Sequence, residues 1–254
     1  MPVRILEGQR AIVTGASSGI GAAIARRFAA EGAAMWAAGG GNEEGLRRTV
    51  EECGKNGTKA GGRCYNLFPA SRAAELVREG AEFLGGLDIL VNCAAMRCHK
   101  PFTEFTDEDI EALFDVNAKS VFYASREAAL RMIPGGGGRI LMIGSIDGER
   151  GRAGNALYCA TKTSMHNLTR ALAVELGPKG VRVNCIAPGT TESERVRKIH
   201  EQRPDYAASK LPEIPVRRFA SPEEMASLAL FLVSKENDFM NGAIVTSDGG
   251  TLAM

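Results

Sequence analysis

The chain has 254 residues, 44% of them hydrophobic, and its 31 Lys and Arg nearly balance its 30 Asp and Glu. This length fits one large α/β domain, and the balanced charge gives no support to binding of nucleic acid or of a membrane surface through net charge. The first residues lack the apolar core of a signal peptide, and no apolar run is long enough to span a bilayer. We therefore expect a cytoplasmic protein that binds neither nucleic acid nor membrane.

The first element is a short apolar strand, residues 11–13, which ends at the turn Thr14-Gly15-Ala16-Ser17-Ser18-Gly19-Ile20-Gly21. A helix follows to residue 30, because the segment is rich in helix formers. Glycines in such a turn let backbone N–H groups approach a pyrophosphate, and the helix presents the positive end of its dipole. The stretch predicts a dinucleotide site. A plain chain reversal is the alternative, since the glycine spacing differs from the common dinucleotide fingerprint.

The remaining chain continues the alternation of strand and helix. Strands are predicted at residues 33–38, 59–67, 87–92, 139–144, 181–187 and 243–247, and helices at 42–53, 71–84, 106–114, 117–133, 155–176 and 221–233. Strand 87–92 is almost entirely apolar, as expected for a strand buried on both faces of a parallel sheet. The pattern predicts an α/β fold over residues 1–254, one doubly wound parallel sheet of the Rossmann type with helices on both faces. Its ligands should lie at the carboxyl ends of the strands.

Tyr158 and Lys162 are four residues apart near the start of the long helix, so their side chains adjoin. An ammonium beside a phenol favours the phenolate, which lets the pair move a proton to or from an alcohol. Ser145 ends the preceding strand and can hydrogen-bond a substrate oxygen. Taken alone, however, the Tyr-x-x-x-Lys spacing is also typical of an ordinary helix face with an interfacial tyrosine and a solvated lysine.

Several motifs at matching distances resemble the short-chain dehydrogenase/reductase family, over residues 6–250. They are Thr14-Gly15-x-x-x-Gly19-Ile20-Gly21, Asn92 after a buried strand, Asn117, Ser145, Tyr158-x-x-x-Lys162 and Pro188-Gly189. The layout is also similar to that of the 3-oxoacyl-carrier-protein reductases within the family. The resemblance implies an NAD(P)-dependent oxidoreductase that interconverts a secondary alcohol and a ketone by hydride transfer, acting on a small-molecule substrate.

The resemblance also implies a role for individual residues. Tyr158 would be the general acid/base, Lys162 would assist it and hold the nicotinamide ribose, and Ser145 would orient the substrate oxygen. Asn117 would anchor a water that links Lys162 to solvent. The expected cofactor contacts are Gly15, Ser17, Ser18, Gly19, Ile20, Gly21, Gly39, Gly40, Asn66, Leu67, Asn92, Ala94, Tyr158, Lys162, Pro188, Gly189, Thr191 and Ser193.

The end of the second strand bears on the choice between NAD and NADP. An acidic residue there would bind the adenosine ribose, whereas a basic residue would pair with the 2′-phosphate of NADP. The chain has Gly39, Gly40 and Gly41 at this place. No carboxylate repels the phosphate and no cation holds it, so the sequence slightly favours NADP and leaves NAD open.

Residues 190–219 form a connection longer than usual, rich in charge and proline, which predicts a substrate lid. Basic residues near the pocket are Arg97, His99, Lys100, Arg150 and Arg152. A solvated rim is one interpretation of them; if two point inward, the substrate carries an anionic group. Such a substrate could be an oxo or hydroxy acid or an acyl thioester, and sugar-like compounds stay open.

Six cysteines form no Cys-x-x-Cys pair, so we expect reduced thiols. Cys93, Cys98 and His99 are conceivable metal ligands, but free cysteine is among the most buried residue types, and the sequence predicts no metal site. The alternative to an enzyme is a non-catalytic NAD(P)-binding regulator that senses redox state; such proteins typically lack the tyrosine or lysine. The resemblance further implies a homo-oligomer, a tetramer joined through residues 106–133, 155–176 and 222–250.

Overall fold

The computed structural model describes residues 4–203 and 205–254; residues 1–3 and 204 of the expected domain lie outside the described residues. The described chain builds one parallel sheet in the order β3-β2-β1-β4-β5-β6-β7. Its strands are β1 (Arg10–Thr14), β2 (Ala34–Gly39), β3 (Ala60–Cys64), β4 (Ile89–Asn92), β5 (Gly138–Ile143), β6 (Val181–Pro188) and β7 (Ile244–Ser247). The strand order reverses between β1 and β4, which is where ligands of doubly wound sheets bind.

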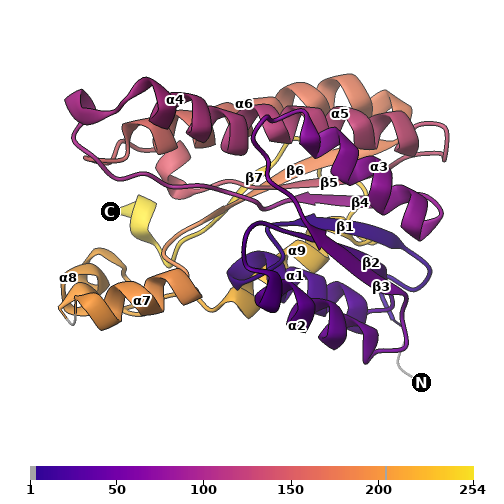
Figure 1. Ribbon diagram of the computed structural model, residues 1–254, viewed down its shortest axis with the longest axis horizontal. Coiled ribbons are helices and arrows are strands. Elements are labelled where there is room, and N and C mark those ends of the chain that lie inside the picture. The colour runs from indigo at the N-terminus through magenta and orange to yellow at the C-terminus, as the bar shows by residue number, and fades with distance from the viewer. Residues whose placement is uncertain (1–3, 204) are drawn as a thin grey trace.

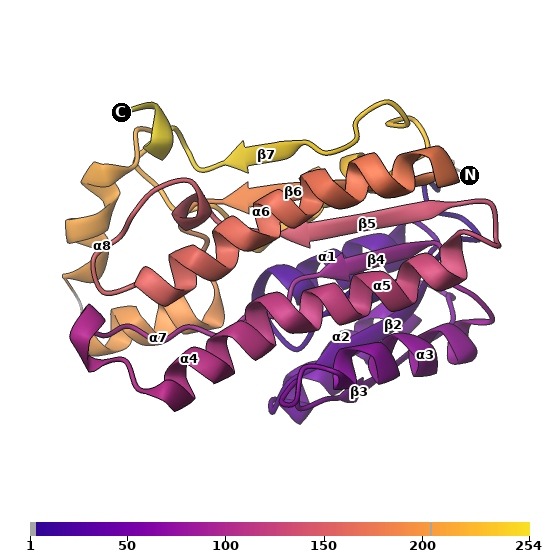
Figure 2. The ribbon, with the colours of Figure 1, turned by 90° about the horizontal axis from the view of Figure 1, so that it is seen from above.

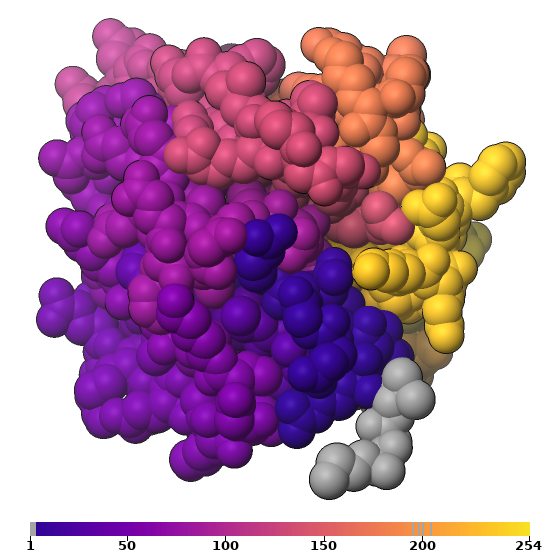
Figure 3. Space-filling model, turned by 90° about the vertical axis from the view of Figure 1, so that its right-hand side faces the viewer, coloured from indigo at the N-terminus to yellow at the C-terminus, as the bar shows by residue number. Residues whose placement is uncertain are grey.

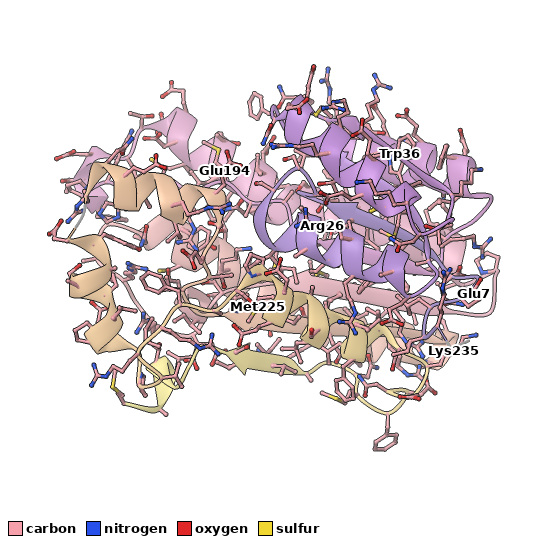
Figure 4. All side chains as sticks on the ribbon, turned by 90° about the horizontal axis from the view of Figure 1, so that it is seen from below. Glu7, Arg26, Trp36, Glu194, Met225 and Lys235 are labelled. Atoms are coloured by element: carbon pink, nitrogen blue, oxygen red, sulfur yellow. The ribbon has the colours of Figure 1, made fainter. Side chains whose placement is uncertain are left out.

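Helices cover both faces of the sheet (Figure 1). One face carries α1 (Gly19–Ala30), α2 (Glu43–Gly54) and α9 (Pro222–Val233). The other carries α3 (Arg72–Leu84), α4 (Asp107–Phe114), α5 (Ser120–Met132) and α6 (Ala156–Leu176). Seen from below, α9 with Met225 lies beside α1 with Arg26 (Figure 4). The doubly wound Rossmann fold predicted from the alternation is confirmed.

The burial of β4 shows why its sequence is apolar throughout. Ile89 and Val91 belong to the hydrophobic core on the α1 and α9 side, whereas Leu90 belongs to the core on the α3, α5 and α6 side. Successive side chains of a strand point to opposite faces, so a strand covered on both faces needs apolar residues at every position.

Three of the predicted helix starts are confirmed by side-chain caps. The Asn42 side chain accepts a hydrogen bond from the backbone of α2. Thr106 and Asp109 form a capping box at the start of α4, and Ser221 and Glu224 form another at the start of α9. Each cap satisfies N–H groups that the first turn of a helix leaves without partners.

Two predicted boundaries differ from the structure. The third strand was expected over residues 59–67 but ends at Cys64, because its one neighbour, β2, ends at Gly39, the residue paired with Cys64. The helix expected over residues 117–133 is instead α5, and it continues without a break from α4 through a π-helical segment, η2 (Asp115–Lys119). No proline or glycine interrupts residues 107–132, so nothing in the sequence ends the first helix before the second begins.

The strands all point toward one end of the molecule, where α7 (Glu194–Gln202) and α8 (Tyr206–Lys210) lie beyond β6 (Figure 2). This end also holds the short turns η1 (Phe102–Glu104), η3 (Ile146–Gly148), η5 (Leu211–Glu213) and η6 (Thr251–Ala253), whereas η4 (Gly177–Lys179) precedes β6. At the opposite end, the indigo, magenta and yellow segments form one continuous surface (Figure 3). Within residues 4–203 and 205–254, no helix combines the length and apolar character needed to cross a bilayer.

Candidate active site

The glycine turn after β1 requires glycine for steric reasons. Gly15 has φ +68°, and a Cβ there would lie 2.9 Å from the backbone of Ala94. A Cβ on Gly21 would lie 2.3 Å from the carbonyl oxygen of Gly15. Gly19 also has a positive φ, +55°. The turn therefore lies tightly against the start of α1 and the end of β4, with its backbone close to any ligand at the helix N-terminus.

Thr14 ties the turn to the neighbouring strand. Its Oγ1 accepts hydrogen bonds from the backbone N–H groups of Cys93 and Ala94, at 2.9 and 3.0 Å, and donates to the carbonyl of Val91. These bonds fix the ends of β1 and β4 against each other at the place where the strand order reverses. The buried Thr14 side chain and the backbone at the end of β4 therefore fix the position of the glycine turn.

A cavity of about 980 Å³ opens at the carboxyl ends of the strands. It is lined by most of the residues that the sequence predicts as cofactor contacts or catalytic groups: Gly15, Ser17, Ser18, Ile20, Gly39, Gly40, Asn66, Leu67, Ala94, Ser145, Tyr158, Lys162, Pro188, Gly189, Thr191 and Ser193. The volume is at the upper end of the range of about 300–1,000 Å³ found for small-molecule and cofactor pockets.

Four predicted site residues stand behind this wall: Gly19, Gly21, Asn92 and Asn117. The Asn92 side chain is buried and donates to Ser125 Oγ at 3.1 Å, so it fastens β4 to α5 instead of facing the cavity. Gly19 and Gly21 shape the turn.

Asn117 lies in the π-helical segment and is fully buried. Its Oδ1 accepts from the backbone N–H of Met96 at 2.7 Å, and its Nδ2 donates to the Met96 carbonyl at 2.9 Å and to Thr161 Oγ1 at 3.2 Å. Thr161 Oγ1 in turn donates to the carbonyl of Tyr158. Asn117 thus connects the loop after β4 to the start of α6 through Met96 and Thr161.

Tyr158, Lys162 and Ser145 converge on one wall of the cavity. Tyr158 and Lys162 are both almost completely buried as residues, and Lys162 Nζ lies 5.7 Å from the centre of the Tyr158 ring. Lys162 Nζ donates to the carbonyl of Ile143, at the end of β5, at 2.7 Å. Ser145 Oγ accepts from the backbone N–H of Asp147 at 3.1 Å, so the Ser145 proton stays available for donation to a ligand.

Arg97, from the loop after β4, contacts the Tyr158 phenol directly. Its guanidinium carbon lies 3.9 Å from the centre of the ring, and its Nη2 donates to the hydroxyl at 2.9 Å. This is both a cation–π contact and a charge-assisted hydrogen bond. The sequence places Arg97 near the pocket but gives no signal for the contact, because 61 residues separate the two side chains.

Only some of the basic residues considered from the sequence gather at the cavity. Arg150 and Arg152 line it together with Arg97, around the buried carboxylate of Asp147, a residue that the sequence analysis did not single out. Two others turn to different partners. Lys100 pairs with Asp109, and the His99 ring lies 3.3 Å from Asn155 Oδ1.

The two ends of the cavity differ in charge. Gly15, Gly39, Gly40, Gly41 and Glu43 line one end, which we call the glycine end, and the space around Gly40 and Gly41 is open to an added side chain. The basic residues that line the cavity are Arg97, Arg150, Arg152 and Lys162. We call Arg97, Asp147, Arg150 and Arg152 the arginine end.

Two side chains near Lys162 and Ser145 have pKa values that differ from their ordinary values. Burial raises the pKa of the Cys93 thiol to about 11, with the Lys162 ammonium acting in the opposite direction, so this thiol is neutral at physiological pH. Burial lowers the pKa of His166, whose ring lies between Gly144 and Gly148 on either side of Ser145. Across the described residues, no three His, Cys, Asp or Glu side chains gather as a metal ion would require.

The strand order and the glycine turn at the reversal point define a dinucleotide-binding protein of the Rossmann class. A family model described as enoyl-(acyl carrier protein) reductase matches residues 15–251. The chain belongs to the short-chain dehydrogenase/reductase family, and it is an NAD(P)-dependent oxidoreductase. The family resemblance and the enzyme class predicted from the motifs are confirmed.

Relatives of this chain bear names for different substrates. An acetoacetyl-CoA reductase of Allochromatium vinosum is 37% identical over 94% of this chain and 97% of its own length. A gluconate 5-dehydrogenase of Gluconobacter oxydans is 33% identical, over 96% of this chain and 95% of its own. The crystal structure of a short-chain dehydrogenase from Burkholderia cenocepacia in complex with NADP superposes with a TM-score of 0.91 at 34% identity, covering 98% of this chain and 99% of that one.

Proposed function

We propose that this chain interconverts a ketone and a secondary alcohol, with Tyr158 as the general acid/base. The observation that carries the proposal is the Tyr158 side chain, which lines the cavity with the buried Lys162 ammonium behind its ring and Ser145 on the neighbouring loop. In the direction of reduction, a reduced nicotinamide bound in this cavity would supply the hydride that the carbonyl carbon receives.

The chain's own groups handle the proton. As the carbonyl oxygen gains negative charge it takes the proton of the Tyr158 hydroxyl, and Ser145 Oγ donates a hydrogen bond to the same oxygen. Arg97 Nη2 donates to the phenolic oxygen of Tyr158, so this hydroxyl can keep its own proton directed at the substrate. In the reverse direction, Tyr158 receives the proton of the alcohol.

Lys162 and Asn117 are proposed to support the transfer. Lys162 would hold the nicotinamide ribose, a role supported by its place on the cavity wall beside Tyr158. Asn117 would anchor a water that connects Lys162 with solvent. This role is supported by the position of Asn117, whose side chain donates a hydrogen bond to Thr161, the residue that precedes Lys162.

The cavity fits an NAD(P) molecule whose pyrophosphate lies on the turn from Gly15 to Ile20, where a Cβ on Gly15 would collide with the backbone. We propose a preference for NADP. Residues 39–41 carry no carboxylate at the end of β2, and Gly40 and Gly41 leave open space there; Glu43, at the start of α2, is the acidic residue that lines this end. The relative from Burkholderia cenocepacia with NADP bound supports the same choice.

Residues 190–219 are proposed as a lid over the substrate. The segment leaves the sheet after β6 and returns to it, with Thr191 bridged to Ala220. Val196 of α7 and Tyr206 of α8 line the cavity. Pro204, inside this segment, lies outside the described residues.

We also propose a cytoplasmic homotetramer joined through α5, α6 and the C-terminal region. Large apolar side chains lie exposed on these elements, where a contact between subunits would bury them. They are Phe122, Leu130, Val174, Phe231 and Phe239. The molar mass in solution, from light scattering, tests this arrangement.

The proposed activity is tested by direct titration with NADH and NADPH, followed by a panel of ketones, oxo acids and 3-oxoacyl thioesters with the tighter cofactor. Loss of reduced nicotinamide absorbance on at least one member supports the enzyme. Tight cofactor binding without turnover on any member would favour the non-catalytic regulator instead.

A further inference from the structure

The arginine end is a cluster of like charges held around one buried carboxylate. Asp147 is 2% exposed, and its carboxylate oxygens lie 3.9 Å from Arg97 Nη1, 3.7 Å from Arg150 Nε and 3.6 Å from Arg152 Nη1. All three distances exceed the range of a hydrogen bond. Within the described chain, Asp147 Oδ1 and Arg150 Nε are buried without any hydrogen-bond partner.

The cluster carries more positive than negative charge. One carboxylate faces three guanidinium groups, and Lys162 adds a further cation behind Tyr158. Of the other acids nearby, Asp109 pairs with Lys100, whereas Glu149 keeps its negative charge and accepts a hydrogen bond from the Thr246 hydroxyl. The three guanidinium groups and Lys162 still outnumber the carboxylates of Asp147 and Glu149. Gathering like charges in a concave wall costs energy unless an anion binds there, and such a wall attracts anions.

Each arginine is about one-third exposed at the side chain, with its remaining surface covered. A partly exposed guanidinium group can bind a carboxylate through two parallel hydrogen bonds while the rest of its side chain stays packed against the protein. The geometry thus resembles an incomplete anion site, in which three arginines line the cavity around the carboxylate of Asp147.

The distance from this cluster to the reacting atoms limits the shape of the ligand. Arg97 donates to the Tyr158 hydroxyl at 2.9 Å, and that hydroxyl is the group proposed to meet the carbonyl oxygen of the substrate. An anion bound to the same guanidinium lies within a few bonds of this carbonyl. In a thioester on a phosphopantetheine arm, the phosphate stands many bonds away from the carbonyl and cannot reach Arg97.

We infer that Arg97, Arg150 and Arg152 bind a carboxylate of the substrate, which makes the substrate a short 2- or 3-oxo acid or the corresponding hydroxy acid. The inference rests on the proposed function and specifies its substrate class. Asp147 is a positioning residue in this arrangement. It orients the arginines and does not contact the substrate.

The first test compares each acid with its methyl ester, which keeps the carbonyl and removes the charge. For 2-oxobutyrate, acetoacetate and their methyl esters, we expect kcat/KM to favour the acid at least about tenfold. Arg150→Gln and Arg152→Gln should remove this preference by raising KM for the acid, with the ester unchanged. Lys100→Gln is the matched control, because it removes a cation of the same region that pairs outside the cluster.

The second test does not depend on turnover. Calorimetric titration of the protein with butyrate, in the presence of saturating NADP, should show binding that Arg152→Gln abolishes and Lys100→Gln retains. Butyramide, which lacks the charge, should not bind. Methyl phosphate binding more tightly than butyrate would overturn the carboxylate assignment, as would equal binding of butyrate by the wild type and Arg152→Gln.

The two tests separate failure of this inference from failure of the proposed function. Equal kcat/KM for acid and ester would overturn the carboxylate site and leave the oxidoreductase reaction intact. Butyrate binding that depends on the arginines, without turnover of any ketone or acid, would support the carboxylate site and contradict the proposed reaction. Unfolding temperatures of the variants show whether each has kept its fold.

Discussion

The glycine end and the arginine end of the same cavity are built in opposite ways. At the glycine end the wall is mostly backbone, and a Cβ on Gly15 would lie 2.9 Å from the backbone of Ala94. At the arginine end the wall is made of long cationic side chains around a buried carboxylate. The comparison leads us to predict that the backbone at the glycine end binds the cofactor through its shape, whereas substrate choice depends on the side chains of the arginine end, which a few substitutions can change.

The largest expected effect is a loss of turnover when the hydroxyl of Tyr158, which contacts Arg97 of the arginine end, is removed. Tyr158→Phe keeps the ring and its packing but removes the proton, so turnover should fall by about 10²- to 10⁴-fold while NADPH affinity stays nearly constant. Steady-state kinetics and a binding titration measure the two quantities separately. Unchanged turnover would show that Tyr158 is not the acid/base.

A methyl group at the glycine end should weaken cofactor binding. Gly15→Ala places a Cβ 2.9 Å from the Ala94 backbone at a φ of +68°, and we expect the NADPH Kd to rise about tenfold or more. Gly57→Ala is the matched control, since Gly57 has a similar φ of +74° and open space around it. If both variants bind NADPH equally well, close approach at Gly15 does not matter for the cofactor.

A cation introduced at the glycine end should have a smaller effect. Gly40→Arg adds a guanidinium in open space beside the proposed 2′-phosphate, and we expect the NADPH Kd to fall about fivefold because the pair is exposed to solvent. NADH affinity should stay constant, and Gly40→Asp should shift the preference toward NADH. A titration in which Gly40→Arg affects both cofactors equally would place the phosphate elsewhere.

The smallest predicted effect is a pH dependence of stability at His166, below the Ser145 loop. Burial lowers the pKa of His166 in the folded state relative to its ordinary value, with Lys162 and Arg170 acting in the same direction and Glu149 opposing. The unfolded chain therefore binds the proton more readily, and the free energy of unfolding should decline as pH falls below about 6.5.

Urea denaturation at pH 7.5 and 5.5 measures this decline. His166→Phe keeps a ring of similar shape between Gly144 and Gly148 and removes the titrating group. The variant should lose less stability than the wild type over the same interval. An identical loss in both proteins would exclude His166 as the source.

Local patterns in the sequence predicted the fold and the placement of most candidate site residues. The Gly15 turn, the caps at Thr106 and Ser221, and the Tyr158-x-x-x-Lys162 spacing each depend on neighbours within a few residues. The roles proposed for Tyr158 and Lys162 stay predictions until they are tested by substitution. Even so, the spacing alone places both side chains on one face of α6.

What the sequence did not predict depends on contacts between distant segments. The contact of Arg97 with Tyr158 joins the loop after β4 to the start of α6, and the ion pair of Arg97 with Asp147 joins it to the loop after β5. Asn92 follows a buried strand, as the motif requires, yet its side chain turns to Ser125 because the packing of β4 against α5 decides its direction. Sequence spacing carries no information about either outcome.

The central claim is that the glycine end determines cofactor affinity and the arginine end determines substrate preference, each independently of the other. It is tested most directly by measuring both properties in a variant of each end. The NADPH Kd and the ratio of kcat/KM for acetoacetate over methyl acetoacetate are measured in the wild type, Gly15→Ala and Arg152→Gln. We predict that Gly15→Ala raises the Kd and leaves the ratio unchanged, whereas Arg152→Gln lowers the ratio and leaves the Kd unchanged. A weaker NADPH affinity in Arg152→Gln, or an altered acid-to-ester ratio in Gly15→Ala, would contradict the division of the cavity into a cofactor end and a substrate end.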